Sequence, residues 1–273
     1  METREFRRII RSFYEKAGRR FPWRNIQNPW GVLVSEFMLQ QTQTERVAAY
    51  YTRWMEKWPG PRDLHNAPLE DVLREWSGLG YNRRARFLKD CARRVTLETA
   101  GVVPREPEDL RALPGIGPYS AGAIACFAYN APTVFIETNI RSVMLHFFFG
   151  SRKEVPDREI LPVLDKTLDR ADPRTWYYAL MDYGAALKKL APNPGRRSAH
   201  YKKQGKFEGS FRQLRGSLLR TLLARGPATA EEIRGLMNTE CSGEEDFYRV
   251  LKTMEKDLLV AEEGGFYRIR EEK

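Results

Sequence analysis

The chain has 273 residues, and its 46 lysines and arginines against 36 aspartates and glutamates give a formal net charge of +10 at pH 7. This excess of cations attracts polyanions over long distances, so nucleic acid is the expected partner. No apolar run approaches the roughly 18 residues that a membrane span needs, and the charged N-terminus does not resemble a secretion signal. We therefore expect a protein of the cytoplasm, associated with the nucleoid, or of the nucleus, with no membrane association and no secretion.

The first 190 residues are predicted to be almost entirely helical. Apolar residues recur at helical spacing after Ala67–Pro68, at Leu69, Val72, Leu73 and Trp76, and again after Pro156–Asp157. Alternating β patterns are scarce in this part of the chain. The pattern therefore predicts an all-α domain, and we place its end near residue 192.

Residues 113–120 read Leu-Pro-Gly-Ile-Gly-Pro-Tyr-Ser and precede an apolar helical run. Glycines at 115 and 117 let backbone N–H groups converge where a β-carbon would block them, and the N-terminus of the next helix favours negative charge. An ordinary tight turn between two helices is the alternative for this pattern alone. We predict that Gly115, Gly117, Tyr119 and Ser120 contact the DNA backbone, which positions the duplex without reading its sequence.

Residues 193–208 form a basic segment with turn-forming residues, and the character of the chain changes after it. Helices are predicted at Phe211–Ala224, Thr229–Met237 and Glu244–Leu259, followed by two short strands around Gly264–Gly265. Three helices and a terminal hairpin resemble a winged helix, so we predict a small α+β winged-helix domain at 209–273. Winged helices bind DNA or serve as protein-interaction modules.

Three further segments, taken with the hairpin, carry a family resemblance. They are Phe21–Arg24 (Phe-Pro-Trp-Arg), Val34–Thr44, which contains Ser-Glu-Phe-Met-Leu-Gln-Gln-Thr, and Trp76–Arg86, which contains Gly-Leu-Gly-Tyr. In this order they resemble the helix-hairpin-helix DNA glycosylases, and within them the MutY-type adenine glycosylases. The resemblance implies two helical subdomains facing each other across a cleft, a hairpin subdomain of about residues 20–130 and a second built from the N-terminus and about 131–192.

Breaking an N-glycosidic bond requires an acid that protonates the base and an anion that stabilises the oxocarbenium ion. Glu36 lies among Val34, Phe37 and Met38, so burial is expected to raise its pKa toward the range of an acid. By resemblance, Glu36 protonates the purine and then positions water. The alternative for Glu36 is a surface glutamate on an amphipathic helix.

Glu137 is the expected anion, although the family pattern has aspartate at this position. Glutamate keeps the charge but adds a methylene, which displaces the carboxylate by roughly 1 to 1.5 Å, and an error of about 1 Å can cost about a hundredfold in rate. Capping of a helix is the alternative role. Tyr119 corresponds to a hairpin position that is lysine in bifunctional relatives, so no Schiff-base lyase step is expected there.

The resemblance also implies residues that handle the base. Trp23 and Arg24 match the adenine pocket, and Tyr178 stands near a position that reads the base. Gln41 and Tyr81 are expected to enter the duplex and fill the space that the extruded base leaves.

Relatives of this kind usually bind an iron–sulfur cluster through four cysteines after a Met-Asp-x-Gly-Ala segment. Here Met181–Ala185 is followed by no cysteine until Cys241, and four thiolates are required. We therefore expect no cluster and no other cofactor, apart from a monovalent cation that could bind at the hairpin. Arg196, Arg197, Lys202 and Lys203 are predicted to replace the cluster loop as phosphate contacts, against the alternative of a solvated linker.

Together these features predict a monomeric, monofunctional DNA repair glycosylase that acts on double-stranded DNA with a mispair or lesion. Adenine in a mispair is the first choice of base. A mismatch-specific thymine or uracil glycosylase, or a hypoxanthine glycosylase, is the alternative. A non-catalytic DNA-damage binder is a second alternative, which Glu137 and the missing cluster favour and the intact string around Glu36 disfavours.

Overall fold

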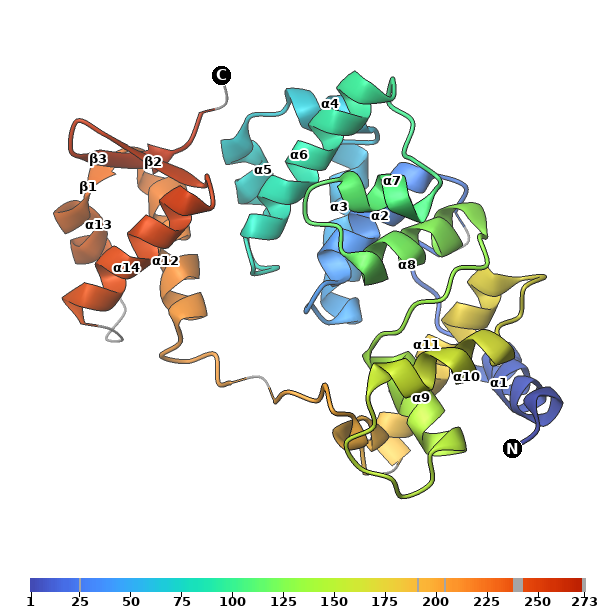
Figure 1. The fold of residues 1–273 in the computed structure, drawn as a ribbon. Coiled ribbons are helices and arrows are strands. Elements are labelled where there is room, and N and C mark those ends of the chain that lie inside the picture. The colour runs from blue at the N-terminus through green and yellow to red at the C-terminus, as the bar shows by residue number, and fades with distance from the viewer. Residues whose placement is uncertain (25, 191, 204, 238–242, 272–273) are drawn as a thin grey trace. The chain divides into compact units, whose positions relative to one another are not determined.

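The computed structural model describes residues 1–24, 26–190, 192–203, 205–237 and 243–271, and these are mostly helical, as predicted (Figure 1). The first eleven helices are α1 (Thr3–Ala17), α2 (Pro29–Leu39), α3 (Thr44–Lys57), α4 (Pro61–Asn66), α5 (Leu69–Trp76), α6 (Arg83–Glu98), α7 (Pro107–Ala112), α8 (Pro118–Tyr129), α9 (Thr138–Phe148), α10 (Asp157–Thr167) and α11 (Pro173–Leu190). They are followed by the 3₁₀ turn η1 (Pro194–Arg197), α12 (Phe211–Arg225), β1 (Ala228–Thr229), α13 (Ala230–Leu236), α14 (Glu244–Lys256), β2 (Val260–Glu263) and β3 (Phe266–Ile269). The helices predicted after Pro68 and Pro156 are α5 and α10.

The chain divides into two compact units. Unit 1 consists of residues 1–33, 104–112 and 116–203, and unit 2 of residues 34–103, 113–115 and 204–273. This division cuts across the predicted domain ranges of 1–192, 193–208 and 209–273, because residues 204–273 share a unit with residues 34–103.

In unit 1, α11 packs against α1 and α9. The ring of Phe6 on α1 meets Phe148 and Trp176 edge-on, with ring centroids 4.9 and 5.7 Å apart. Gly184 allows α11 to approach the start of α9, because a Cβ there would lie 2.4 Å from the backbone oxygen of Asn139. Helix α11 therefore lies directly against the residues that follow Glu137.

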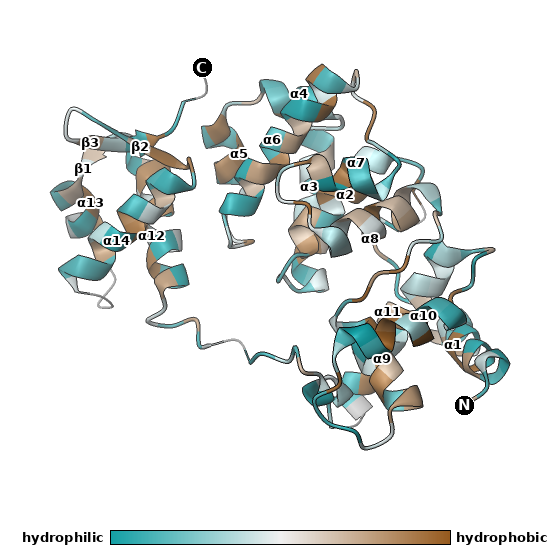
Figure 2. Ribbon diagram, viewed as in Figure 1, coloured by the Kyte–Doolittle hydropathy of each residue, from teal (hydrophilic) through white to brown (hydrophobic). Residues whose placement is uncertain are grey.

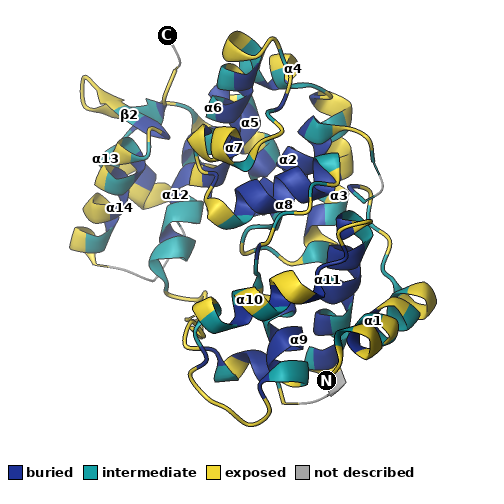
Figure 3. Cartoon of the chain, turned by 45° about the vertical axis from the view of Figure 1, so that its right-hand side comes forward, coloured by how far each residue is buried: buried dark blue, intermediate teal, exposed yellow. Residues whose placement is uncertain are grey.

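Helices differ in how much of their circumference is buried. All residues of α8 from Ser120 to Ala128 are buried. Figure 3 shows α2, α8 and α11 largely in the colour of buried residues, whereas exposed, intermediate and buried residues alternate along α1. The apolar, brown stretches in Figure 2 follow the same helices. A helix that is apolar all round belongs to a core.

In unit 2, the core contains three tryptophans. Trp54 on α3 meets Trp58 and Trp76 edge-on, with ring centroids 4.6 and 5.4 Å apart. Lys89 on α6 is buried and its Nζ donates to the backbone oxygens of Leu64, His65 and Ala67, at the end of α4. The buried ammonium thereby caps α4.

The C-terminal segment contains the three helices and the terminal hairpin that the sequence predicts. Strands β2 and β3 pair antiparallel, and β1 pairs with β3, which gives the order β1-β3-β2. A two-residue strand such as β1 has no alternation that a sequence pattern can reveal. Thr229 caps α13 in a capping box with Glu232. The assignment of this arrangement as a winged helix stays a prediction.

Contacts inside unit 2 join the C-terminal segment to α6. Asp257 forms an ion pair with Arg83 at 3.4 Å and accepts a hydrogen bond from Arg215 at 2.5 Å. Within the described part of the chain, no helix is long and apolar enough to cross a membrane.

Candidate active site

Glu36 lies on α2, which is buried along most of its length. The side chain of Asn28 caps this helix by accepting from the amides of Trp30 and Gly31 at 3.1 and 3.3 Å. Glu36 is 5% exposed, and its neighbours on α2 from Val32 to Met38 are buried as well. This burial excludes the alternative of a surface glutamate on an amphipathic helix.

Both residues expected to enter the duplex lie in turns with left-handed backbone geometry. Gln41 has φ 55° and is exposed, and Tyr81 has φ 48°. Left-handed residues other than glycine are uncommon and are found at functional turns. The hydroxyl of Tyr81 accepts a hydrogen bond from Arg212 at 3.0 Å.

Arg84, which the sequence did not single out, connects these two turns to the helix that carries Glu36. Its guanidinium is buried, and its partners are the backbone oxygens of Phe37, Met38, Leu79 and Gly80 and the hydroxyl of Thr42, at 2.8 to 3.0 Å. Burial lowers the pKa of Arg84 to about 10, so the group is still cationic at neutral pH. One side chain thus holds the end of α2, the Gln41 turn and the Tyr81 turn together.

The predicted hairpin is the turn between α7 and α8. Gly115 has φ 74°, and a Cβ there would lie 2.7 Å from the ring of Phe87, so this position requires glycine. Gly117 precedes α8 with φ −90°, and a Cβ there would meet no described atom within 4 Å apart from its chain neighbours, so packing does not require glycine at this position. Tyr119 is half-buried and Ser120 is buried in the first turn of α8. The structure thus shows the predicted glycine turn, and its contact with phosphate stays a prediction.

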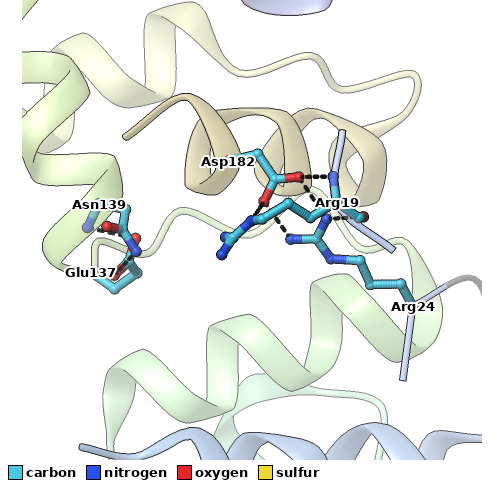
Figure 4. A network of polar contacts seen from close by, with 5 residues as sticks. All are labelled: Arg19, Arg24, Glu137, Asn139 and Asp182. Carbon is cyan, nitrogen blue, oxygen red and sulfur yellow. Dashed lines mark hydrogen bonds and ion pairs between the residues drawn. The ribbon is translucent and has the colours of Figure 1, made fainter. Parts of the chain in front are cut away.

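Glu137 is the N-cap of α9 (Figure 4). Its Oε1 accepts from the amides of Asn139 and Ile140 at 2.7 and 2.8 Å, and its Oε2 accepts from Nδ2 of Asn139 at 3.3 Å. Burial raises the pKa of Glu137 above its ordinary value, although the two amides and the cations Lys188 and Arg141 act in the opposite direction. The capping alternative is therefore present in the structure. It is compatible with an anionic role, because the amides and the helix dipole stabilise a negative charge at this point.

Lys188 on α11 was also not singled out from the sequence. Its Nζ donates to Oδ1 of Asn139 at 2.7 Å. Gly184 and Lys188 are four residues apart and share one face of α11, which packs on the start of α9. That spacing is the signal that could have identified Lys188.

Arg24 is held in a buried ion-pair network with Asp182 and Arg19 (Figure 4). The Arg24 guanidinium makes two bonds of 2.8 Å to the carboxylate of Asp182, which also accepts from Nε and the amide of Arg19. Burial by itself raises the pKa of Asp182, but the bonds from Arg24 and Arg19 outweigh it, so the pKa lies below its usual range. Arg24 therefore anchors its own segment to α11 through the carboxylate of Asp182.

The aromatic residues expected near the base are largely buried. Trp23 is 5% exposed and lies parallel to the ring of Phe21, and Tyr178 stacks on Phe127 with centroids 4.6 Å apart. The guanidinium of Arg24 lies 4.5 Å from the centre of the Tyr178 ring. Whether these residues contact the base stays a prediction.

Comparison with known proteins identifies the family. Residues 34–164 match the HhH-GPD superfamily of base excision DNA repair proteins. A protein of Mycobacterium tuberculosis (strain ATCC 25618 / H37Rv) named adenine DNA glycosylase is 35% identical over 271 residues, which cover 91% of this chain and 88% of that protein. The chain belongs to this superfamily. These findings confirm the predicted family and the predicted DNA glycosylase activity. They favour an enzyme over the non-catalytic alternative, and DNA is the partner.

Other relatives are similar over a shorter range. A Mus musculus protein named adenine DNA glycosylase is 39% identical over 194 residues, which cover 67% of this chain and 38% of that protein. Among solved structures, a thermostable thymine-DNA glycosylase is 26% identical with a TM-score of 0.64, covering 71% of this chain and 92% of that one. A non-covalent endonuclease III–DNA complex is 20% identical with a TM-score of 0.59 and shows the same fold.

The basic segment after α11 begins with a folded turn. The side chain of Asn193 accepts from the amide of Gly195 at 2.9 Å, and Arg197 donates to the backbone oxygen of Leu145 on α9 at 2.8 Å. Val155 and Ser198 form a parallel bridge beside this turn. Arg196, Lys202 and Lys203 are exposed, whereas Arg197 uses its guanidinium inside the protein.

The residues of this chain do not fit the iron–sulfur cluster of related glycosylases. The sequence has three cysteines, and a cluster of this kind takes four thiolates. Cys91 and Cys126 are buried in different units, while Cys241 lies outside the described residues. Burial raises the pKa of the Cys91 thiol, which donates to the backbone oxygen of Pro114. Cys91 is therefore a packing residue under the hairpin.

Proposed function

We propose that the protein removes adenine from mispairs in double-stranded DNA by hydrolysing its N-glycosidic bond. The observation that carries the proposal is the buried carboxyl group of Glu36 on the apolar helix α2. Its sequence context is the Ser-Glu-Phe-Met-Leu-Gln-Gln-Thr string, which resembles the adenine-excising branch. Relatives named adenine DNA glycosylase at 35 to 40% identity support this choice of base.

In the proposed reaction, Glu36 donates a proton to a ring nitrogen of adenine while the bond between the base and C1′ breaks. The bonding electrons leave with the base, and positive charge develops on the sugar. The carboxylate of Glu137 stabilises this charge, since it is held at the N-terminus of α9 by two amides and Asn139. Water then adds to C1′ and returns its proton to Glu36, so no net proton is consumed.

The protein is proposed to be monofunctional and to act as a monomer. Tyr119 offers no amine for a Schiff base at the hairpin position. Gly115 and Gly117 hold the DNA backbone, where a monovalent cation could assist, and Gln41 and Tyr81 fill the space of the extruded base. An intracellular location follows from a DNA substrate.

A panel of duplexes tests this proposal. Each contains adenine, thymine, uracil or hypoxanthine opposite each normal base and opposite 8-oxoguanine, and alkali converts any abasic site into a strand break. We expect breaks in the adenine strand of a mispair, and strand breaks without alkali are not expected. Cleavage confined to another base would reject adenine as the substrate.

A mismatch-specific thymine or uracil glycosylase is the second candidate. The similarity to a solved thymine-DNA glycosylase at 26% identity favours it. By resemblance, an amide or carboxylate that reads adenine is also expected near position 178, where this chain has tyrosine. The same panel distinguishes the two candidates, because the break would then fall in the strand that carries thymine or uracil.

A further inference from the structure

A chain of hydrogen bonds leads from Lys188 to Glu137 within unit 1. Lys188 Nζ donates to Oδ1 of Asn139 at 2.7 Å, and Nδ2 of the same amide donates to Oε2 of Glu137 at 3.3 Å. These hydrogen bonds join α11 to the first turn of α9. Lys188 and Asn139 are 49 residues apart in the sequence. The contact is possible because Gly184 lets the two helices approach each other closely.

The chemistry of the ammonium fixes the orientation of the Asn139 amide. An ammonium group has three donors and no acceptor, so the amide must turn its oxygen toward Lys188. Its NH₂ group then faces Glu137 and donates to the carboxylate. If the amide were reversed, its oxygen would face the ionised carboxylate, and that arrangement would favour the protonated acid.

We propose that Lys188 is a positioning residue that acts through Asn139 to keep Glu137 ionised and correctly oriented for base excision. This inference rests on the proposed role of Glu137 in stabilising the oxocarbenium ion. The described groups that bear on the carboxylate are the amides of Asn139 and Ile140 and the cation Arg141 from α9, and Lys188 from α11.

Charge supports the proposal alongside geometry. Arg141 is itself engaged by Asp157 through two bonds of 2.7 Å, which partly neutralise its charge, whereas the hydrogen bond of Lys188 goes to the neutral amide of Asn139. Burial lowers the pKa of Lys188, and the charge of Glu137 raises it again. The lysine and the glutamate therefore favour each other's charged forms.

The matched variants are Lys188→Met and Lys189→Met. Methionine keeps the length of the lysine stem but removes the ammonium, and Lys189 is the exposed neighbour on the same helix. Single-turnover excision is measured between pH 5 and 9 with enzyme in excess over the mispaired duplex. Thermal unfolding of both variants checks that the fold is retained.

We expect Lys188→Met to move the acidic limb of the pH profile upward by about one pH unit, because the variant removes a cation that lowers the pKa of Glu137, and a nearby opposite charge typically lowers a carboxyl pKa by about 1 to 3 units. Excision at a pH below that limb should then fall about tenfold, and excision well above it should change little. Lys189→Met should follow the wild-type profile. A uniform loss at all pH values, or a profile that matches Lys189→Met, overturns the proposal.

A second measurement does not depend on activity. The Glu137 side-chain carboxyl carbon is assigned by ¹³C NMR through its absence in Glu137→Gln, and its titration is compared between wild type and Lys188→Met. We expect a higher pKa in Lys188→Met, and equal titration curves would overturn the proposal. A wild-type protein that excises no base would refute the proposed function, while this titration would still decide the role of Lys188.

Discussion

Arg212, in the first turn of α12, donates a hydrogen bond from Nη1 to the hydroxyl of Tyr81 at 3.0 Å. The guanidinium also donates from Nη2 to the backbone oxygen of Gly205 at 2.9 Å. The C-terminal segment therefore contacts the side chain that is expected to enter the duplex. This relationship links a residue of the proposed wedge to a segment whose role the sequence left open between DNA recognition and protein interaction.

Tyr81→Ala should reduce discrimination between mispaired and paired targets more than it reduces general DNA binding. The reason is that inserting a side chain costs a few kcal/mol of base unstacking, which is repaid most easily at a mismatch. The measurement is the ratio of excision rates and of dissociation constants on matched and mismatched duplexes. Arg212→Ala tests whether the hydrogen bond contributes to the same ratio. Equal losses on both duplexes would leave Tyr81 with a packing role.

Glu137→Gln should slow excision by roughly 10² to 10³-fold, the typical cost of removing one electrostatic stabiliser from an active site. The glutamine oxygen can still cap α9, so the fold should be kept. Glu137→Asp keeps the negative charge, but the shorter side chain moves the carboxylate back toward the backbone. A displacement of about 1 Å predicts a loss of about a hundredfold in excision rate. Single-turnover rates measure both effects. Undiminished excision by Glu137→Gln would leave helix capping as the sole role of this residue.

Asp182→Asn should destabilise the protein by about 3 to 5 kcal/mol at pH 7, because the buried Arg24 loses its charge partner. The pKa of Asp182 is lowered in the folded state, so its contribution is fully present above the ordinary value of about 3.9 and is lost as the pH falls below it. The difference between wild type and variant in urea unfolding should therefore shrink below about pH 4.

The matched control for this prediction is Asp165→Asn. Asp165 pairs with Arg170 at the surface, where both side chains are about half exposed, and such pairs contribute about 0 to 1 kcal/mol. Equal losses of stability in the two variants would contradict the importance of the buried network.

Sequence patterns predicted the helices, the hairpin and the burial of Glu36 because each depends on neighbours in the chain. Alternation and helical spacing report which face of an element is apolar, and a glycine pair reports a turn. Arg84 could not be predicted in this way. Its hydrogen bonds reach back 42 to 47 residues to the end of α2 and its following turn, and nothing local distinguishes Arg84 from Arg83. The Lys188–Asn139 contact likewise depends on how α11 packs against α9.

Neutralising Arg196, Lys202 and Lys203 together should weaken binding on every DNA sequence. It should also reduce the slope of log K against log salt by up to about 0.9 for each phosphate that is no longer neutralised. Arg197 is left unchanged, because its guanidinium bonds to the backbone of α9. The measurement is DNA binding at salt concentrations between about 50 and 200 mM. An unchanged slope would make residues 193–208 a linker that does not bind phosphate.

Three cations of α14 provide the comparison set for this experiment. Arg249, Lys252 and Lys256 are exposed on the helix whose opposite face is buried. If the C-terminal segment binds DNA, neutralising them should also reduce the salt slope. A slope equal to that of wild type would favour a protein-interaction role for this segment.

The release of free adenine by wild type and by Glu36→Gln under single-turnover conditions tests most directly whether the protein excises adenine with Glu36 as the acid. Isotope-labelled adenine is placed in a mispair, and the released base is identified by chromatography and mass spectrometry. We expect wild type to release adenine, and Glu36→Gln to release none while binding the duplex within a few fold of wild type, because the DNA grip is spread over many phosphates. Release of adenine by Glu36→Gln at a near-wild-type rate would contradict the role of Glu36 as the acid. Release of a different base by wild type would contradict adenine as the substrate.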